Sequence, residues 1–446
     1  MSASDVFVFN IPDYNSSEIY DVLPEEVFSL IVPGNTIVLK PNWIRESHIS
    51  RPEEWEQVIT HPVVITAVLK KVLDKLKGQG KISIVDSPET ASSFEKILSH
   101  YPVSLWKSMT DEAGIALDII DLREDEWISD ANVIIKRKKL PGDPLGSTQV
   151  NLLNDASEFF THSPSKKGYF GADSDISETN MAHDGSNNLY RVSRTVLEAD
   201  VFINLPKLKT HKKAGITSSL KNLVGINTYK NFLPHNSIGT FEDGGDQFPV
   251  KNSKSVIESF LMPFIHRYIL VNPVLSRLFS PLMGLGKKIF GDNSKTIRGG
   301  SWYGNDTMWR TILDLNKVLF YANPDGTMRK GEWSASKKYI TVVDGILAGE
   351  GEGPKSPDAV KLGYLFCGTN PVATDAVCAN FMGFDPLKIP AISKAFSVNR
   401  YSLTDFNYDQ IVAKINNENF KPGEIPPKFL KNLRPHHGWT GHIEIH

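Results

Sequence analysis

Two short apolar runs, NTIVL at residues 35–39 and KISIV at residues 81–85, are rich in the β-branched residues that favour strands. Between them, residues 61–77 carry apolar side chains at helical spacing. A strand, a helix and a second strand in this order form a βαβ unit, whose strands are parallel because the helix crosses over between them. The sequence therefore predicts an α/β fold with a mostly parallel sheet and flanking helices.

Polar residues follow both predicted strands. Lys40 and Asn42 come directly after the first strand, and Asp86 comes directly after the second. Ligands of open α/β sheets gather at the carboxyl ends of the strands, so we expect these three residues in the wall of a binding site. The alternative is that Asn42 and Asp86 only cap turns.

Further strands and helices are predicted towards the C-terminus. The expected elements are a helix near residues 190–197, a strand at 200–205, a helix at 306–321, strands at 338–343 and 363–367, and a helix at 371–382. Asn370 suits the N-cap of the last helix. The run GEGEGP at residues 349–354 is expected to be a loop, because glycine and proline disfavour regular elements.

Composition divides the chain into six segments. The expected segments are an α/β part at 1–130, a polar loop excursion at 131–189, a basic core segment at 190–250, an apolar helical insertion at 251–300, a second α/β part at 301–395 that completes the core, and an irregular tail at 396–446.

The apolar stretch at residues 256–290 leaves two interpretations open. His266, Arg267 and Arg277 interrupt it before about 18 apolar residues accumulate, so a membrane-spanning helix is not expected. The stretch is either a buried helical insertion or an amphipathic surface that rests on a membrane or a partner. The first residues show no secretory pattern, which predicts a cytoplasmic protein, with peripheral membrane contact under the second interpretation.

Charge and cysteine content exclude several classes of protein. Lysine and arginine (49) nearly balance aspartate and glutamate (51), so no overall field attracts nucleic acid, and any anion binding must be local. Cys367 and Cys378 lie eleven positions apart, so no cysteine-ligated iron–sulfur cluster is expected within this chain. The phosphate-loop, dinucleotide-binding and serine-hydrolase motifs are missing from the sequence.

The segment PKLKTHKKAGITSSLKN at residues 206–222 carries the strongest functional signal. Its chemistry-bearing residues are Lys207, Lys209, His211, Lys212, Lys213, Gly215, Thr217, Ser218, Lys221 and Asn222. Lysines supply positive charge, hydroxyl groups supply hydrogen bonds, and glycine lets the backbone approach a ligand. If residues 217–219 open a helix, its N-terminus adds partial positive charge. The segment predicts an anion pocket; the alternative is a solvated basic loop.

The residues of this segment can be given roles. His211 is the predicted general acid or base, with a structural hydrogen-bonding role as the alternative. Lys207 and Lys221 are expected to stabilise developing negative charge, and neighbouring lysines lower one another's pKa. The predicted substrate-binding residues are Lys209, Thr217, Ser218 and Asn222, together with Lys40 and Asn42, and with His183 and His235 from polar loops that could fold over the site.

Carboxylates from other segments are expected to meet the basic segment. Asp344, Asp375 and Asp86 are candidate ligands of a divalent cation such as Mg²⁺. Ion pairing with the lysines is the alternative, and helix capping is a further alternative for Asp375. Glu350 and Glu352 lie in the glycine-rich run. The histidines near the C-terminus, which are predicted to form a surface tail, are His436, His437, His442 and His446.

Several motifs resemble the hallmark blocks of the domain-of-unknown-function family 362. They are PKLKTH and TSSLKNLVG in the basic segment, LKPN at 39–42, THP at 60–62, VDSP at 85–88, and VDGILAGEGEGP with NPVATDAVCANFMGFDP within 343–386. Many relatives carry a ferredoxin-like cluster domain with cysteine repeats, which this sequence lacks. The family has no generally established reaction, so the resemblance implies membership without a substrate.

A weaker resemblance concerns the nickel-pincer lactate racemase family. His211, Gly215, Thr217 and Lys221 look like that family's histidine, glycine, hydroxyl and lysine pattern. In that family the lysine tethers a pyridinium-type cofactor and histidines handle protons or metal. The resemblance implies isomerase or epimerase chemistry, while the cofactor of this chain stays unknown.

Together these observations predict an enzyme that binds a small anionic metabolite, bearing a carboxylate or a phosphate, in a cleft of lysine, histidine and aspartate residues. A redox accessory protein related to iron–sulfur family members is one alternative. A non-catalytic scaffold at a membrane surface is another, and only residues 256–290 favour it. The sequence makes no prediction of the oligomeric state.

Overall fold

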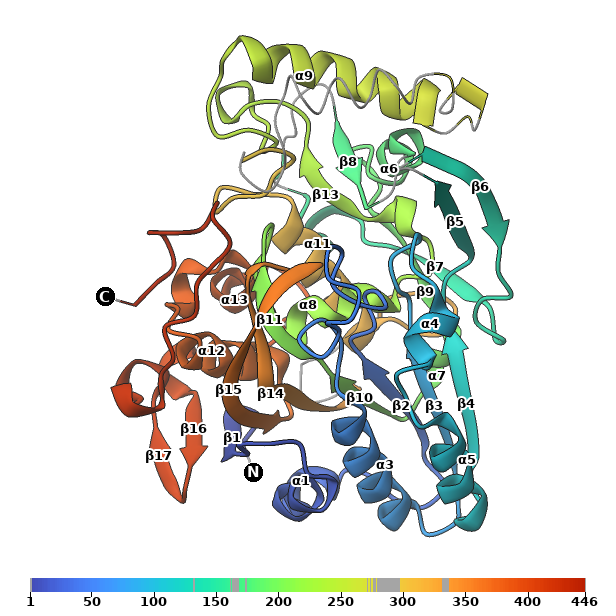
Figure 1. The fold of residues 1–446 in the computed structure, drawn as a ribbon, viewed down its shortest axis with the longest axis vertical. Helices are drawn as coiled ribbons and strands as arrows, with labels where there is room; N and C mark the ends of the chain where they lie inside the picture. The colour runs from blue at the N-terminus through green and yellow to red at the C-terminus, as the bar shows by residue number, and fades with distance from the viewer. Residues whose placement is uncertain are drawn as a thin grey trace.

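A central mixed sheet organises the computed structural model (Figure 1). The structure describes residues 2–445 except 131–132, 161, 163–167, 173–174, 271, 273, 276–277, 279–296 and 331–336. In spatial order, nine strands are β17 (Glu418–Phe420), β16 (Val412–Ile415), β1 (Asp5–Asn10), β15 (Ser356–Gly368), β14 (Lys338–Glu352), β10 (Val201–Leu205), β2 (Thr36–Pro41), β3 (Lys81–Asp86) and β4 (Ala116–Asp121). Two further strands of this sheet, β11 (Lys207–His211) and β12 (Gly215–Thr217), branch from β14, because β11 pairs with β14 and β12 pairs with β11.

The middle of the sheet is parallel. β14, β10, β2, β3 and β4 pair in parallel in this order. The helix α3 (Pro62–Leu76) is the crossover between β2 and β3. These observations confirm the predicted α/β fold with a mostly parallel sheet.

Two hydrophobic cores cover the two faces of the sheet. Along β2, Ile37 and Leu39 belong to one core and Val38 belongs to the other, because successive side chains of a strand point to opposite faces. The helix α3 packs on the first face, whereas α11 (Met308–Tyr321) and α12 (Pro371–Phe381) pack on the second. Burial on both faces explains why the strands are continuously apolar.

Smaller elements surround this centre. The remaining helices of the described chain that have α-helical geometry are α1 (Ser16–Val22), α2 (Glu25–Phe28), α4 (Phe94–Leu98), α5 (Val103–Glu112), α6 (Ile176–Ala182), α7 (Arg194–Glu198), α8 (Ser219–Asn222), α9 (Ser253–Phe264) and α13 (Pro390–Ser393). Three two-stranded sheets pair β5 (Asp125–Asp130) with β6 (Val133–Lys139), β7 (Ser147–Asn151) with β9 (Leu189–Ser193), and β8 (Tyr169–Gly171) with β13 (Pro234–Ser237). The polar residues 131–189 thus contain strands and a helix as well as loops.

Two predicted local structures are wrong in part. Residues 189–193 form β9, which pairs antiparallel with β7, and only α7 after it is helical. Only the end of the glycine-rich run is a loop: β14 continues through Glu352 and pairs with β15, and Gly353 and Pro354 lie in the turn that follows. A Cβ atom at Gly349 would lie 2.9 Å from the Cβ of Lys209. Glycine at this position permits the close approach of β11, so it allows two strands to pair and does not end β14.

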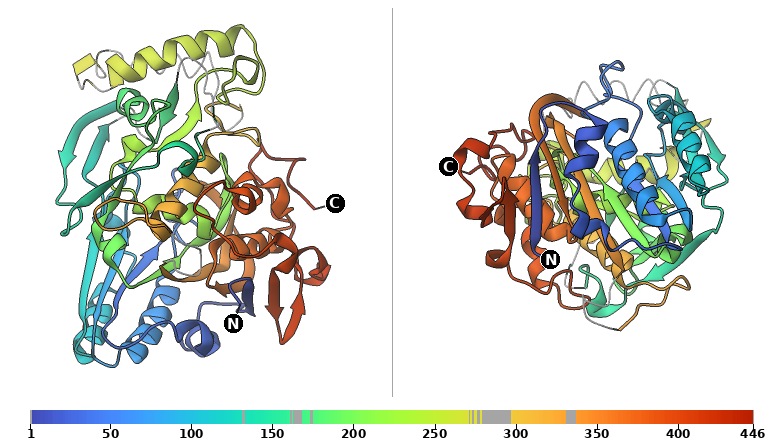
Figure 2. Two further views of the ribbon diagram at one scale, coloured as in Figure 1. Left: turned by 180° about the vertical axis from the view of Figure 1, so that it is seen from behind. Right: turned by 90° about the horizontal axis from the view of Figure 1, so that it is seen from below.

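The helix α9 lies at one end of the molecule, away from the central sheet (Figures 1 and 2). A helix thus lies within the segment where an apolar helical insertion is predicted, and residues 271, 273, 276–277 and 279–296 of that segment lie outside the described residues. Several large apolar side chains of α9 and the residues just after it are exposed, with Phe260 at 73% and Phe264 at 55%. Among the helices that the structure describes, none is long and apolar enough to cross a membrane.

Candidate functional site

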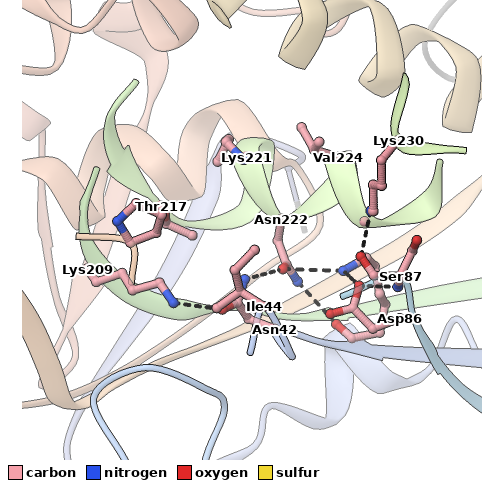
Figure 3. Close-up of a pocket in the computed structure, with 13 residues that line it drawn as sticks. Asn42, Ile44, Asp86, Ser87, Lys209, Thr217, Lys221, Asn222, Val224 and Lys230 are labelled. Atoms are coloured by element: carbon pink, nitrogen blue, oxygen red, sulfur yellow. Dashed lines mark hydrogen bonds and ion pairs between the residues drawn. The ribbon is translucent and has the colours of Figure 1, made fainter. Parts of the chain in front are cut away.

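A cavity of about 60 Å³, large enough for several water molecules, opens at the carboxyl ends of β2 and β3 (Figure 3). The residues that line it are Lys40, Asn42, Ile44, Asp86, Ser87, Lys209, Thr217, Lys221, Asn222, Val224, Gly225, Lys230 and Pro354. It therefore combines the ends of two parallel strands with the basic segment. Lys40, Asn42 and Asp86 lie in its wall, where the strand-end rule places ligand-binding residues.

A buried ion pair forms the floor of this cavity. Lys40 Nζ lies 2.7 Å from Asp86 Oδ1. Burial lowers the pKa of Lys40, and the charge of Asp86 opposes that change. A Cβ atom on Gly225 would lie 2.2 Å from Asp86 Oδ1 and 2.6 Å from Lys40 Nζ, so only glycine fits above the pair.

Asparagine side chains hold Lys209 and Lys40 in place. Lys209 Nζ donates to Asn42 Oδ1 at 2.9 Å, and Asn42 Nδ2 donates to Asn222 Oδ1 at 2.8 Å. Asn222 Oδ1 also accepts from Lys40 Nζ at 3.3 Å. Burial and the charges of Lys207 and Lys221 lower the pKa of Lys209 well below its usual value. The network fixes the direction of both ammonium groups before any ligand binds (Figure 3).

Lys221 differs from the other lysines of the cavity. Among the described residues, its amino group has no hydrogen-bond or ion-pair partner (Figure 3). Burial lowers the pKa of Lys221 to about 7, and the charges of Lys230 and Lys40 add to this effect. Lys230 Nζ, in contrast, donates to the backbone oxygen of Ser87 at 2.6 Å. Among the lysines of the cavity, Lys221 is therefore the one whose amine is not held by any described residue.

Two hydroxyl groups of the cavity are buried without a partner. Thr217 is 3% exposed and Ser87 is 4% exposed, yet neither Thr217 Oγ1 nor Ser87 Oγ makes a hydrogen bond in the described structure. A buried polar group without a partner costs free energy of about 1–3 kcal/mol. Both residues line the cavity, so the oxygen atoms of a ligand are candidate partners for these hydroxyl groups.

Lys207 and Asp344 form a second buried pair, outside the cavity lining. Lys207 Nζ lies 2.5 Å from Asp344 Oδ2, and both side chains are fully buried. Asp344 also accepts from the hydroxyl of Tyr14 at 2.9 Å and from the backbone nitrogen of His61 at 2.9 Å. Asp344 therefore forms an ion pair with a lysine, which was the alternative to metal binding. Lys207 does not line the cavity that contains Lys221.

Asp375 caps α8. Its Oδ1 accepts from Ser219 N at 2.6 Å and its Oδ2 from Leu220 N at 3.0 Å. Burial raises its pKa to about 6, although these hydrogen bonds oppose the rise. Ser218 is the N-cap residue of α8 and does not line the cavity. The start of α8 is therefore occupied by a carboxylate and is not free to bind an anion.

The three carboxylates expected to share a metal ion do not meet. Asp344 is bound by Lys207, Asp375 by the start of α8, and Asp86 by Lys40. Of the three, only Asp86 lines the cavity. We correct the metal prediction accordingly: each carboxylate is satisfied by its own donors, so their oxygen atoms do not converge on one cation.

The histidines lie around the cavity without lining it. His211 Nδ1 accepts from the backbone nitrogens of Lys213 and Ala214, both at 3.1 Å, and burial together with nearby lysines holds its pKa well below the usual value. His235 Nδ1 lies 2.9 Å from the oxygen of Leu233. The structure favours the hydrogen-bonding alternative for His211, because its Nδ1 is occupied by two backbone N–H groups and its side chain does not line the cavity.

His183 is also engaged on both ring nitrogens. Its Nδ1 lies 3.2 Å from Asn188 Oδ1 and its Nε2 lies 3.1 Å from the oxygen of Phe232. Burial lowers its pKa to about 4. His183 joins two loops instead of reaching the cavity.

The prediction of a surface tail is wrong for His436. This residue is 1% exposed, and with His437 and Glu352 it forms a group of side chains close enough for a metal ion. His436 Nδ1 accepts from Gly438 N at 3.1 Å, which leaves the proton on Nε2, 3.1 Å from Glu352 Oε2. A protonated nitrogen cannot bind a metal, so this ring donates to the carboxylate. His442 is exposed as predicted, and His446 lies outside the described residues.

Sequence reasoning missed several residues of the lining. They are Ile44, Ser87, Val224, Gly225, Lys230 and Pro354. Ser87 directly follows Asp86, so the strand-end rule could have found it. Lys230 lies nine positions beyond Lys221 with no local signal, and only the fold brings it to the cavity.

The fold and the site define an α/β protein with a buried, lysine-lined cavity at the carboxyl ends of its parallel strands. The family described as "Domain of unknown function (DUF362)" matches residues 37–148 and 171–380. The chain belongs to this family, which confirms the prediction made from its motifs. No curated protein matches the sequence.

Solved structures show a distant similarity. A protein from Thermotoga maritima has 11% sequence identity and a TM-score of 0.34, over 83% of this chain and 60% of that chain. A lactate racemase apoprotein from Thermoanaerobacterium thermosaccharolyticum has 11% identity and a TM-score of 0.33, over 85% of this chain and 56% of that chain. The chain thus spans less than two thirds of the length of either protein.

Proposed function

We propose that this protein is an enzyme that binds a small anionic metabolite, bearing a carboxylate or a phosphate, in the lysine-lined cavity. One observation carries the proposal: four lysines and a single aspartate line the cavity. Several like charges are costly to bury close together unless a counter-charge arrives. A bound anion supplies that charge, and its oxygen atoms can accept from the two hydroxyl groups that lack partners.

We further propose that the reaction is an isomerisation or epimerisation. Such a reaction needs a group that activates a carbon–hydrogen bond, either as a base or by forming an imine, and a pKa close to the working pH suits either role. Lys221, whose pKa is lowered to about 7, meets this requirement. We therefore propose Lys221, which lines the cavity, as the central catalytic residue in place of His211.

Calorimetric titration with inorganic phosphate and with malonate tests the binding site. At pH 6, where Lys221 is largely charged, Lys221→Met should weaken binding by about tenfold or more, because a hydrogen bond to a charged group contributes about 1.5–3 kcal/mol. Thr217→Val, which removes only the hydroxyl, should weaken it roughly fivefold, equivalent to about 1 kcal/mol.

Lys213→Met is the matched control. Its pKa is also lowered to about 7 by burial and by Lys212, but its Nζ donates to Asn236 Oδ1 at 2.8 Å and it does not line the cavity. This variant should bind both anions like the unaltered protein. Absence of binding by the unaltered protein, or an equal loss in the control, would show that the cavity is not an anion site.

We propose a second property, attachment of α9 to an anionic lipid surface. Its exposed apolar side chains include Val256, Ile257, Phe260, Leu261 and Phe264. The exposed charged residues of α9 and of the turns that follow it are basic, Lys254 and Arg267, whereas Glu258 is buried and paired with Arg298. An apolar face flanked by positive charge is typical of helices that lie in the membrane interface. Loss of vesicle binding on removal of these apolar side chains tests the proposal.

A further inference from the structure

The amino group of Lys221 is free to react, and those of the other cavity lysines are held. Lys40 is paired with Asp86, Lys209 donates to Asn42 and to the backbone oxygen of Val58, and Lys230 donates to the backbone oxygen of Ser87. Lys221 has no such partner among the described residues. An ammonium group that only binds an anion needs no neutral form, whereas a nucleophilic amine does.

The surroundings of Lys221 favour the neutral amine. Its side chain lines the cavity together with Thr217 and Asn222, and Lys40 and Lys230 supply positive charge nearby. A pKa of about 7 leaves about half of the amines neutral at pH 7, against roughly one in 3,000 at the ordinary pKa. Burial and neighbouring cations are the two conditions that activate a lysine as a nucleophile.

We propose that Lys221 forms an imine with the carbonyl group of a small anionic substrate, either a 2-oxo acid or a phosphorylated aldehyde or ketone. The inference rests on the proposed anion site and names the class of substrate that the site takes.

The chemistry balances without a further reactant. The neutral nitrogen of Lys221 attacks the carbonyl carbon, a carbon–nitrogen bond forms, and the carbonyl oxygen leaves as water with both hydrogens of the amine. No electron donor or acceptor is consumed. Protonation of the imine then acidifies the neighbouring carbon–hydrogen bond, which is the step that an isomerisation or epimerisation requires.

The remaining groups of the cavity suit the negative charge of such a substrate. A protonated imine is a cation among Lys40, Lys209 and Lys230, so it forms readily only when the same molecule brings an anion. The hydroxyl groups of Thr217 and Ser87 have no partner and can donate to the oxygen atoms of the carboxylate or phosphate.

Reductive trapping tests the inference. The unaltered protein is incubated at pH 8 with sodium cyanoborohydride and either pyruvate or dihydroxyacetone phosphate, and the adduct is located by peptide mass spectrometry. We expect one adduct per chain, on Lys221, from at least one of the two compounds, and the compound that reacts identifies the anion. Lactate, which has no carbonyl group, and acetone, which has no charge, should give no adduct.

Lys213→Met and Lys221→Arg are the paired variants. The first should keep the adduct, and the second should lose it while phosphate still binds, because arginine retains the charge but forms no imine under these conditions. In the unaltered protein Lys221 should carry at least about tenfold more label than Lys213, a preference equivalent to ~1.4 kcal/mol.

The two proposals fail in different ways. Phosphate binding without any adduct, or label spread evenly over Lys221 and Lys213, overturns the imine and leaves the anion site standing. Absence of phosphate binding in the unaltered protein overturns both.

Discussion

Lysines of one short segment have different surroundings, and these surroundings decide what each can do. Lys207 is neutralised by Asp344, Lys209 is held by Asn42, and Lys221 has no partner among the described residues. The segment alone predicts that these lysines meet in one pocket. The structure separates an internal ion pair from an amine without a described partner, because the partners of these lysines come from other parts of the chain.

Asp375 provides a test at the level of one residue. Both of its oxygens accept from backbone nitrogens at the start of α8, and the amide of Asp375→Asn has only one accepting oxygen. One buried nitrogen loses its partner, so we expect a loss of about 1–3 kcal/mol in the free energy of unfolding, measured by urea denaturation.

Asp409→Asn, at an exposed position, is the control and should change stability by less than about 0.5 kcal/mol. Mg²⁺ should not change the melting temperature of either protein. A stabilisation by Mg²⁺ that Asp375→Asn abolishes would instead restore the metal-binding role for this carboxylate.

Contacts with neighbouring elements determine the conformation and burial of individual segments more than the intrinsic preferences of their residues do. The run GEGEGP is predicted to be a loop, yet its first four residues extend β14. Pairing with β15 satisfies their backbone, and the close approach of Lys209 in β11 requires a residue without a side chain at position 349. The helix α9 shows the converse. The sequence predicts a helix here, but it does not predict whether the apolar face of that helix is buried. In the structure this face is exposed, because no other described element covers it.

The exposed face of α9 gives a prediction at the level of the element. The double variant Phe260→Ser and Phe264→Ser removes two side chains whose burial contributes about 1.5–3 kcal/mol each, so its affinity for vesicles that contain phosphatidylserine should fall by at least about tenfold in a sedimentation assay. Binding should also weaken at high salt, because Lys254 and Arg267 contribute electrostatically.

Leu145→Ser serves as the control for α9, since this side chain is 48% exposed and lies outside the helix. Its vesicle binding should equal that of the unaltered protein. If the unaltered protein does not sediment with these vesicles, α9 is not a lipid-binding surface.

The whole molecule buries several lysines whose pKa values fall on folding. Burial, together with neighbouring positive charge, lowers the pKa of Lys213 and Lys221 to about 7 and that of Lys337 to about 8, against 10.5 for an ordinary lysine. Between these values the unfolded chain binds more protons than the folded one. The free energy of unfolding therefore rises with pH in this window.

This linkage predicts an unusual pH profile. In buffers free of phosphate, the midpoint of urea unfolding should be higher at pH 9 than at pH 7, and Lys221→Met should reduce the difference because it removes one of the titrating groups. A midpoint that falls over this range, or a slope that Lys221→Met leaves unchanged, would show that these lysines are charged in the folded protein.

The sequence by itself determined the α/β class, the family, the main strands and helices, and the position of a site at the ends of two strands. These features follow from residues close together in the chain: a period of two or 3.6 in apolar side chains, and polar residues directly after a strand. Lys40, Asn42 and Asp86 could be found in this way.

Only the tertiary structure decided which charged groups share a cavity. The separation of Lys207 from Lys221, the capping of α8 by Asp375 and the arrival of Lys230 depend on contacts between segments distant in sequence. The physical reason is that the pKa and reactivity of a buried lysine depend on its desolvation and its nearest charges, which are properties of the packed molecule.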